Sequence, residues 1–137
     1  MRAGLPLADA GALGGFGDVI KESCTEIAGG DVNARGWSQA ALPVRAGGLG
    51  FRDVVSHSYA AYIASFKGAG GLACRIDAAF DPEDSDNICG MQDAIMGLAA
   101  KVQPEAAINL GELHVKLRKL SALIDEKGSA DIKAAQS

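Results

Sequence analysis

Apolar residues recur along this chain at the spacing of an α-helix, and strand-like alternation is absent from its sequence. The clearest stripe lies in residues 54–66, where apolar side chains stand at positions i, i+4, i+7, i+8 and i+11. Its members are Val55, Tyr59, Tyr62, Ile63 and Phe66. Asp53 stands where an N-cap belongs, and the glycines of residues 68–71 predict the end of the helix. The pattern predicts one helix of about four turns here.

Two shorter helices are predicted before this one. Asp18 is expected to cap the first, which ends at the glycine pair of residues 29–30. Its apolar positions are Val19, Ile20, Cys24 and Ile27. Asp31 is expected to cap the second, which must end before Pro43 because the residue that precedes a proline is disfavoured in the helical region.

Two later stripes carry apolar residues at alternating spacings of three and four, which is typical of a narrow helical seam. They are Ile88, Met91, Ile95, Leu98 and Val102 in the first, and Leu110, Leu113, Leu117, Leu120 and Ile124 in the second. Pro104 and Gly128 are expected to end these helices, which together predict a C-terminal antiparallel amphipathic hairpin. Residues 75–87 form an acidic connector before it, and residues 129–137 are expected to be a frayed helical tail. The fold class is therefore all-α, a single domain over residues 1–137 with about five helices.

The composition is typical of one globular domain. A chain of 137 residues with 48% hydrophobic and 22% charged residues lies outside the class of disordered proteins. Its three cysteines, Cys24, Cys74 and Cys89, lie far apart, which favours reduced thiols over a disulfide framework. No apolar run reaches the roughly 20 residues of a membrane span, and residues 1–13 lack the apolar core of a secretory signal. We therefore expect an intracellular protein, cytoplasmic or nuclear, with no membrane contact.

The sequence offers no frame for catalysis or metal binding. The two histidines, His57 and His114, lie on predicted helices, and no Gly-x-Ser-x-Gly elbow or Cys-x-x-Cys pair accompanies them. The acidic connector has the alternation of a calcium loop, but Asp86 stands where that loop needs glycine and Gln92 where it needs glutamate. We therefore predict no catalytic residue, no cofactor and no metal site. A small hydrolase that uses a cysteine or histidine is kept as a third alternative.

A glycine-rich turn in the middle of the chain is the remaining motif. From Trp37 to Asp53 the sequence reads W-S-Q-A-A-L-P-V-R-A-G-G-L-G-F-R-D, and an alanine-rich helix follows in residues 54–66. This segment resembles the region that follows the polymerase palm in reverse transcriptases of non-LTR retrotransposons. The charged residues 116–125 are similar to a helix that comes later in the same reading frames. The likeness extends over residues 16–125, and residues 37–52 are its specific part.

The departures from that family decide what the resemblance implies. Its polymerases hold two magnesium ions with palm carboxylates, which include an aromatic-x-Asp-Asp turn. This chain has no two adjacent aspartates and no Cys/His knuckle. The resemblance therefore implies a fragment from the thumb or connecting region, without the catalytic palm, that assists template or duplex positioning in a larger polymerase and is not itself an enzyme.

Phosphate contact is the chemistry expected of the glycine-rich turn. Guanidinium groups flank three glycines whose backbone N–H groups can approach a phosphate. The expected nucleic-acid contacts are Arg45, Gly47, Gly48, Gly50, Arg52, Lys116, Arg118 and Lys119. The net charge of −4 makes this contact weak outside a full-length polymerase.

Two other interpretations remain open at this point. The glycines can serve only to reverse the chain tightly, so that Trp37 and Leu42 pack on Phe51 and Tyr62. The expected structural anchors are Trp37, Leu42, Pro43, Phe51 and Tyr62. The chain can also be a helical interaction module that forms a homodimer or binds a helical partner. Its docking faces would be the seam of residues 110–124 and the stripe of Tyr59, Tyr62 and Phe66.

Overall fold

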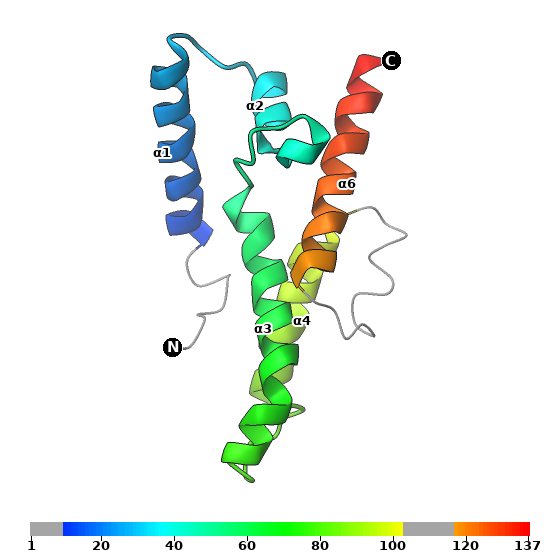
Figure 1. Cartoon of the computed structure of the whole chain (residues 1–137). Helices are drawn as coiled ribbons and strands as arrows, with labels where there is room; N and C mark the ends of the chain where they lie inside the picture. Colours follow the sequence, from blue (N-terminus) through cyan, green and yellow to red (C-terminus); the bar gives the residue numbers. More distant parts are fainter. Residues whose placement is uncertain (1–9, 103–116) are drawn as a thin grey trace.

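Helix α3 lies at the centre of the molecule, and the other helices are arranged around it (Figure 1). The computed structural model describes residues 10–102 and 117–137. Within these ranges the helices are α1 (Ala10–Ala28), α2 (Ala34–Ala41), α3 (Val54–Ile76), α4 (Ser85–Ala99) and α6 (Leu117–Gln136), with a 3₁₀ turn at Val44–Ala46. No residue of this part is in a strand. The predicted all-α fold is confirmed.

The core lies where α3, α4 and α6 meet. Ile63 of α3, Leu98 of α4 and Leu120 of α6 are completely buried. They are joined by Tyr59, Ala60, Ala94 and Val102. Burying an aliphatic side chain of this size stabilises the fold by roughly 1.5–3 kcal/mol. The stripes predicted in residues 54–66 and 88–102 therefore supply much of the core, and Leu120 of α6 adds to it.

A glycine lets α3 and α4 approach closely. A Cβ atom on Gly97 would lie 2.6 Å from the ring of Tyr59, so this ring packs directly against the backbone of α4. The connection between α3 and α4 is short, and the two helices form an antiparallel hairpin (Figure 1). Helix α6 packs mainly on α3 and α2. The hairpin expected from the last two stripes includes Leu110 and Leu113, which lie outside the described residues.

Both caps predicted in the N-terminal part are wrong. Helix α1 begins at Ala10, so Asp18 lies inside it and does not cap it. The helix contains Gly14, Gly15 and Gly17, each of which costs only about 1 kcal/mol in a helix, and it packs against α3. Helix α2 is capped by Asn33 rather than Asp31, because the Asn33 side chain accepts a hydrogen bond of 2.7 Å from the Gly36 amide.

Three predicted boundaries also differ from the structure. Helix α3 runs through the glycines of residues 68–71 and ends at Ile76. The acidic connector therefore shrinks to residues 77–84. Helix α6 continues through Gly128 to Gln136, where the buried Ile132 holds its later turns against the fold. By contrast, Asp53 caps α3 as expected and accepts from the amides of Val55 and Ser56.

No helix in the described ranges combines the length and the apolar character that crossing a lipid bilayer requires.

Candidate nucleic-acid interface

The glycine-rich turn folds back onto the end of α2. The amides of Leu49 and Phe51 both donate to the carbonyl of Ala40, each at 3.1 Å, and the Gly50 amide donates to the Leu42 carbonyl at 2.8 Å. Gly47 and Gly50 have positive φ angles of 81° and 78°, which favour glycine.

Gly48 is required for a different reason, namely close contact. A Cβ atom there would lie 2.0 Å from the carbonyl oxygen of Leu42. The tight reversal of the chain thus requires all three glycines, Gly47, Gly48 and Gly50.

The amides of these glycines are used inside the turn. Gly47 donates to Val44 at 3.0 Å and Gly48 donates to Pro43 at 3.1 Å. With Gly50 bonded to Leu42, none of the three N–H groups is left for a phosphate. The backbone cradle expected at the glycines is therefore not formed, because the turn satisfies its own donors.

Four of the five expected anchors hold the turn in place. The rings of Trp37 and Phe51 stack with centroids 5.9 Å apart and an interplanar angle of 16°. Leu42 and Pro43 are buried, and the Leu42 side chain lies against α6 at Gly128. Tyr62 instead stacks on Phe66 and packs at the edge of the α3–α4–α6 core.

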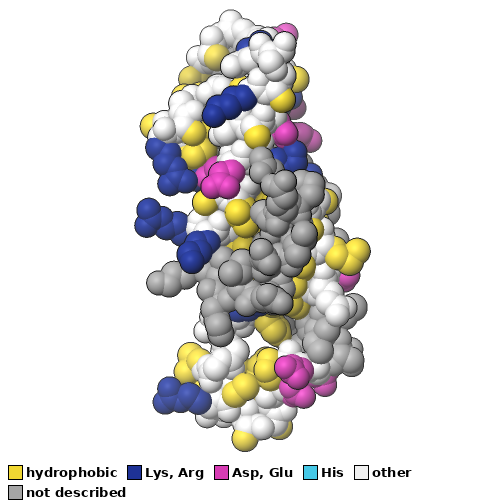
Figure 2. Space-filling model, turned by 90° about the vertical axis from the view of Figure 1, so that its right-hand side faces the viewer, with side chains coloured by type: hydrophobic (Ala, Val, Ile, Leu, Met, Phe, Trp, Pro, Cys, Tyr) yellow, Lys and Arg dark blue, Asp and Glu magenta, His cyan; other side chains and the backbone are white. Residues whose placement is uncertain are grey.

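The structure brings three of the predicted phosphate contacts into one cavity. Arg45 of the turn, Arg52 at the entry to α3 and Arg118 of α6 line a cleft of about 420 Å³, which we call the basic cleft. Its other lining residues are His57, Ala61, Ser121 and Asp125. Figure 2 looks onto the side that α6 occupies and shows Lys and Arg side chains gathered along its left-hand edge. Lys119 is exposed on α6 but does not line the cleft, and Lys116 lies outside the described residues.

Asp125 is the buried counter-charge of the basic cleft. Its side chain is 10% exposed, and its Oδ1 accepts a hydrogen bond of 3.1 Å from Nη1 of Arg52. Nη2 of Arg45 lies 3.6 Å from Oδ2, which accepts no hydrogen bond. Among the described residues that line the cleft, three guanidinium groups face one carboxylate, which is an excess of positive charge.

His57 holds Arg52 from the other side. Its Nε2 lies 2.8 Å from Nη1 of Arg52, and its Nδ1 lies 3.0 Å from the carbonyl oxygen of Asp53. Arginine can only donate, so Nε2 is the acceptor and the neutral ring carries its proton on Nδ1, which donates to Asp53. Motif analysis assigned no role to His57 or Asp125, because Asp125 is 73 residues from Arg52 and no local pattern links them.

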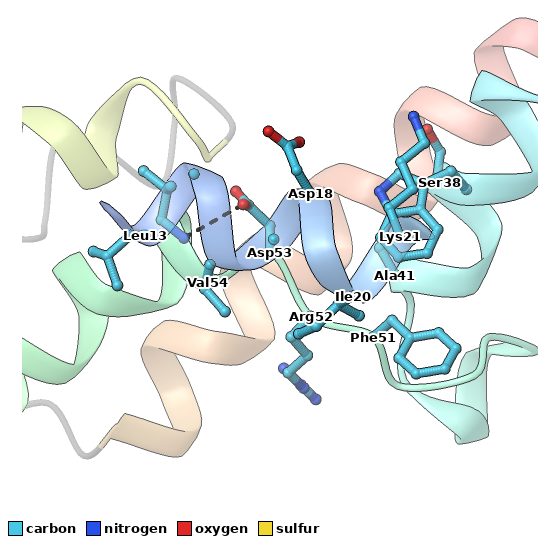
Figure 3. A pocket seen from close by; sticks show the side chains of 14 residues that line it. Leu13, Asp18, Ile20, Lys21, Ser38, Ala41, Phe51, Arg52, Asp53 and Val54 are labelled. Carbon is cyan, nitrogen blue, oxygen red and sulfur yellow. Dashed lines mark hydrogen bonds between the residues drawn. The ribbon is translucent and has the colours of Figure 1, made fainter. Parts of the chain in front are cut away.

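A second cavity of about 420 Å³ lies between α1, α2 and the entry to α3 (Figure 3). We call it the aromatic groove, because the stacked rings of Trp37 and Phe51 are part of its wall. The ammonium group of Lys21 lies 6.0 Å from the Trp37 ring centroid. Figure 3 shows Lys21 and Ser38 at one end of the groove and Leu13 and Val54 at the other. Arg52 lines both cavities, so they are neighbours.

Across residues 10–102 and 117–137, no three His, Cys, Asp or Glu side chains are grouped so that they could hold a metal ion. No protein-family model, curated protein or solved structure matches the chain. The relation to reverse transcriptases therefore stays a prediction that depends on residues 37–52.

Proposed function

We propose that this chain is a non-catalytic helical domain that contacts the phosphates of a nucleic acid through its basic cleft. In a larger polymerase of the reverse-transcriptase kind, it would assist the positioning of template or duplex. The observation that carries the proposal is the convergence of Arg45, Arg52 and Arg118 from three separate segments on one cavity, whose described lining holds a single carboxylate.

The geometry of the cleft suits a phosphate. A guanidinium group carries five N–H donors in a planar fork, and toward the part of the chain that the structure describes Arg52 uses only its Nη1, for Asp125 and His57. Its Nε and Nη2 donors remain to be offered to a ligand oxygen. Asp125 and His57 hold Arg52 in one orientation, which reduces the entropy lost when a ligand binds. Phosphate contact thus comes from side chains and not from the glycine amides.

The test is the salt dependence of binding to a fluorescent duplex. We expect the double variant Arg45→Ala, Arg118→Ala to bind more weakly, and the slope of log affinity against log salt to become shallower by about 0.9 for each lost phosphate contact. Arg35→Ala is the matched control, because Arg35 is exposed on α2 and does not line the cleft. An unchanged slope in the double variant would refute phosphate contact in the cleft.

A second candidate function, self-association, is favoured by one observation on α1. Phe16, Val19 and Ile27 share one side of this helix and are 56%, 57% and 88% exposed. The two docking faces that the sequence predicted are less accessible to a partner, because Tyr59 and Leu120 are buried in the core. In this interpretation the wild-type chain dimerises at micromolar concentration and Phe16→Ser with Val19→Ser abolishes the dimer in light scattering. A wild-type chain that stays monomeric would exclude it.

A further inference from the structure

The aromatic groove is built differently from the basic cleft beside it. Its walls carry the stacked rings of Trp37 and Phe51, and Phe51 keeps 36% of its surface exposed. On α1 the groove is lined by Gly14 and Gly17, which contribute no side chain. A Cβ atom on Gly14 would meet nothing within 4 Å. The volume of about 420 Å³ lies in the range of small-ligand pockets.

The groove has the two features that bind an unpaired base. Exposed aromatic rings offer a stacking surface to any of the bases, and a cation beside such a ring meets the negative charge of the strand. Lys21 supplies that cation at 6.0 Å from the Trp37 centroid. Arg52 links the groove to the basic cleft, where the phosphates of the same strand would lie. A duplex cannot use the groove without unpairing, because its bases are stacked on one another.

We infer that the aromatic groove takes one unpaired nucleobase of a single strand whose phosphates lie in the basic cleft, so that the domain prefers single-stranded to duplex nucleic acid. This inference rests on the proposed function, because the phosphate contacts hold the strand. The inference adds a second binding site, which recognises an unpaired base. The basic cleft alone contacts phosphates and does not distinguish single-stranded from duplex nucleic acid.

The chain carries its own reporter for this site. Trp37 is the only tryptophan, so quenching of its fluorescence reports on the groove. Three probes of equal length are compared: an oligothymidylate, an abasic strand with the same phosphates, and a duplex. We expect the oligothymidylate to quench Trp37 and to bind about tenfold more tightly than the abasic strand, as one base stacked on an aromatic ring allows. We also expect it to bind more tightly than the duplex.

A pair of glycine substitutions on α1 isolates the groove. Gly14→Leu places a side chain in the groove, whereas Gly15→Leu makes the same chemical change at an exposed position that does not line it. Both positions have open space at Cβ and lie inside α1, so both variants gain helix propensity and keep the fold. We expect Gly14→Leu to lose the preference for bases while it binds the abasic strand like the wild type. Gly15→Leu should keep the preference.

The outcomes separate the two proposals. Equal, salt-dependent binding of the oligothymidylate and the abasic strand would overturn the inference and leave the proposed function intact. Retention of the base preference in Gly14→Leu would also overturn the inference, because the base would then lie elsewhere. If none of the three probes binds, both proposals fail.

Discussion

Gly48 is the position where a single added methyl group should disturb the fold most directly. In Gly48→Ala the Cβ atom would lie 2.0 Å from the carbonyl oxygen and 2.4 Å from the carbonyl carbon of Leu42, and 2.7 Å from the carbonyl oxygen of Gln39. These are backbone atoms, which cannot rotate away as the end of a side chain can. The turn must therefore move by about 1 Å or more before the contact becomes an ordinary one.

The magnitude follows from the hydrogen bonds that such a movement breaks. The amides of Leu49, Gly50 and Phe51 hold the turn on the carbonyls of Ala40 and Leu42. Three bonds of this kind contribute about 0.5–1.5 kcal/mol each, so we expect Gly48→Ala to lower the free energy of unfolding by about 2–4 kcal/mol. A small domain has only about 5–15 kcal/mol in total, and this loss is therefore easily measured.

The matched control is Gly50→Ala in the same turn. Gly50 has open space at Cβ, so an alanine there meets no steric contact. Its positive φ of 78° should lower the free energy of unfolding of Gly50→Ala by about 1–2 kcal/mol. Urea unfolding, followed by helical ellipticity and Trp37 fluorescence, gives the free energy of unfolding of each variant. If Gly48→Ala is as stable as Gly50→Ala or more stable, the contact with Leu42 does not constrain the turn and the reasoning is wrong.

Three further substitutions test other parts of the structure. Leu98→Ala removes a completely buried side chain and should lower the free energy of unfolding by about 2–5 kcal/mol, measured by urea unfolding. Asp53→Ala removes the cap of α3 and should cost about 1 kcal/mol, seen as a lower melting temperature; an unchanged value would mean that solvent replaces the cap. Asp125→Ala should lower stability by about 1–3 kcal/mol, because Arg52 loses its acceptor, and should raise affinity for a duplex because the cleft loses its negative charge. An affinity for the duplex that does not change in Asp125→Ala would contradict the proposed cleft.

The parts of the fold that sequence reasoning predicted well are those that depend on local spacing. The stripes of α3 and α4 and the Asp53 cap follow from a period of 3.6 residues and from one side chain at the right offset. The ends at residues 68–71 and at Gly128 were wrong, because a glycine costs a helix only about 1 kcal/mol and tertiary packing can exceed that. The contact between the Leu42 side chain and α6 at Gly128 is one example of such packing. It joins residues that are far apart in the sequence, so local spacing could not reveal it.

The candidate site was predictable only in part for the same reason. Arg45 and Arg52 flank a recognisable motif, and the stack of Trp37 on Phe51 was expected from it. The carboxylate that organises these arginines comes from α6, and only the folded chain brings it to them. The hydrogen-bond partners of the glycine amides could not be predicted either, because the sequence of a turn does not show which carbonyl groups lie close to its N–H groups.

The glycines of α3 divide this helix into two parts that should differ in how readily they open. Residues 54–66 carry the core, whereas Gly68, Gly70 and Gly71 meet no side chain and Leu72 and Ile76 are 58% and 79% exposed. Amide protons of the outer part should therefore exchange with solvent through local opening, and those of the inner part only through global unfolding. The tip of the α3–α4 hairpin is thus the region that can change shape on contact with another molecule while the core stays folded.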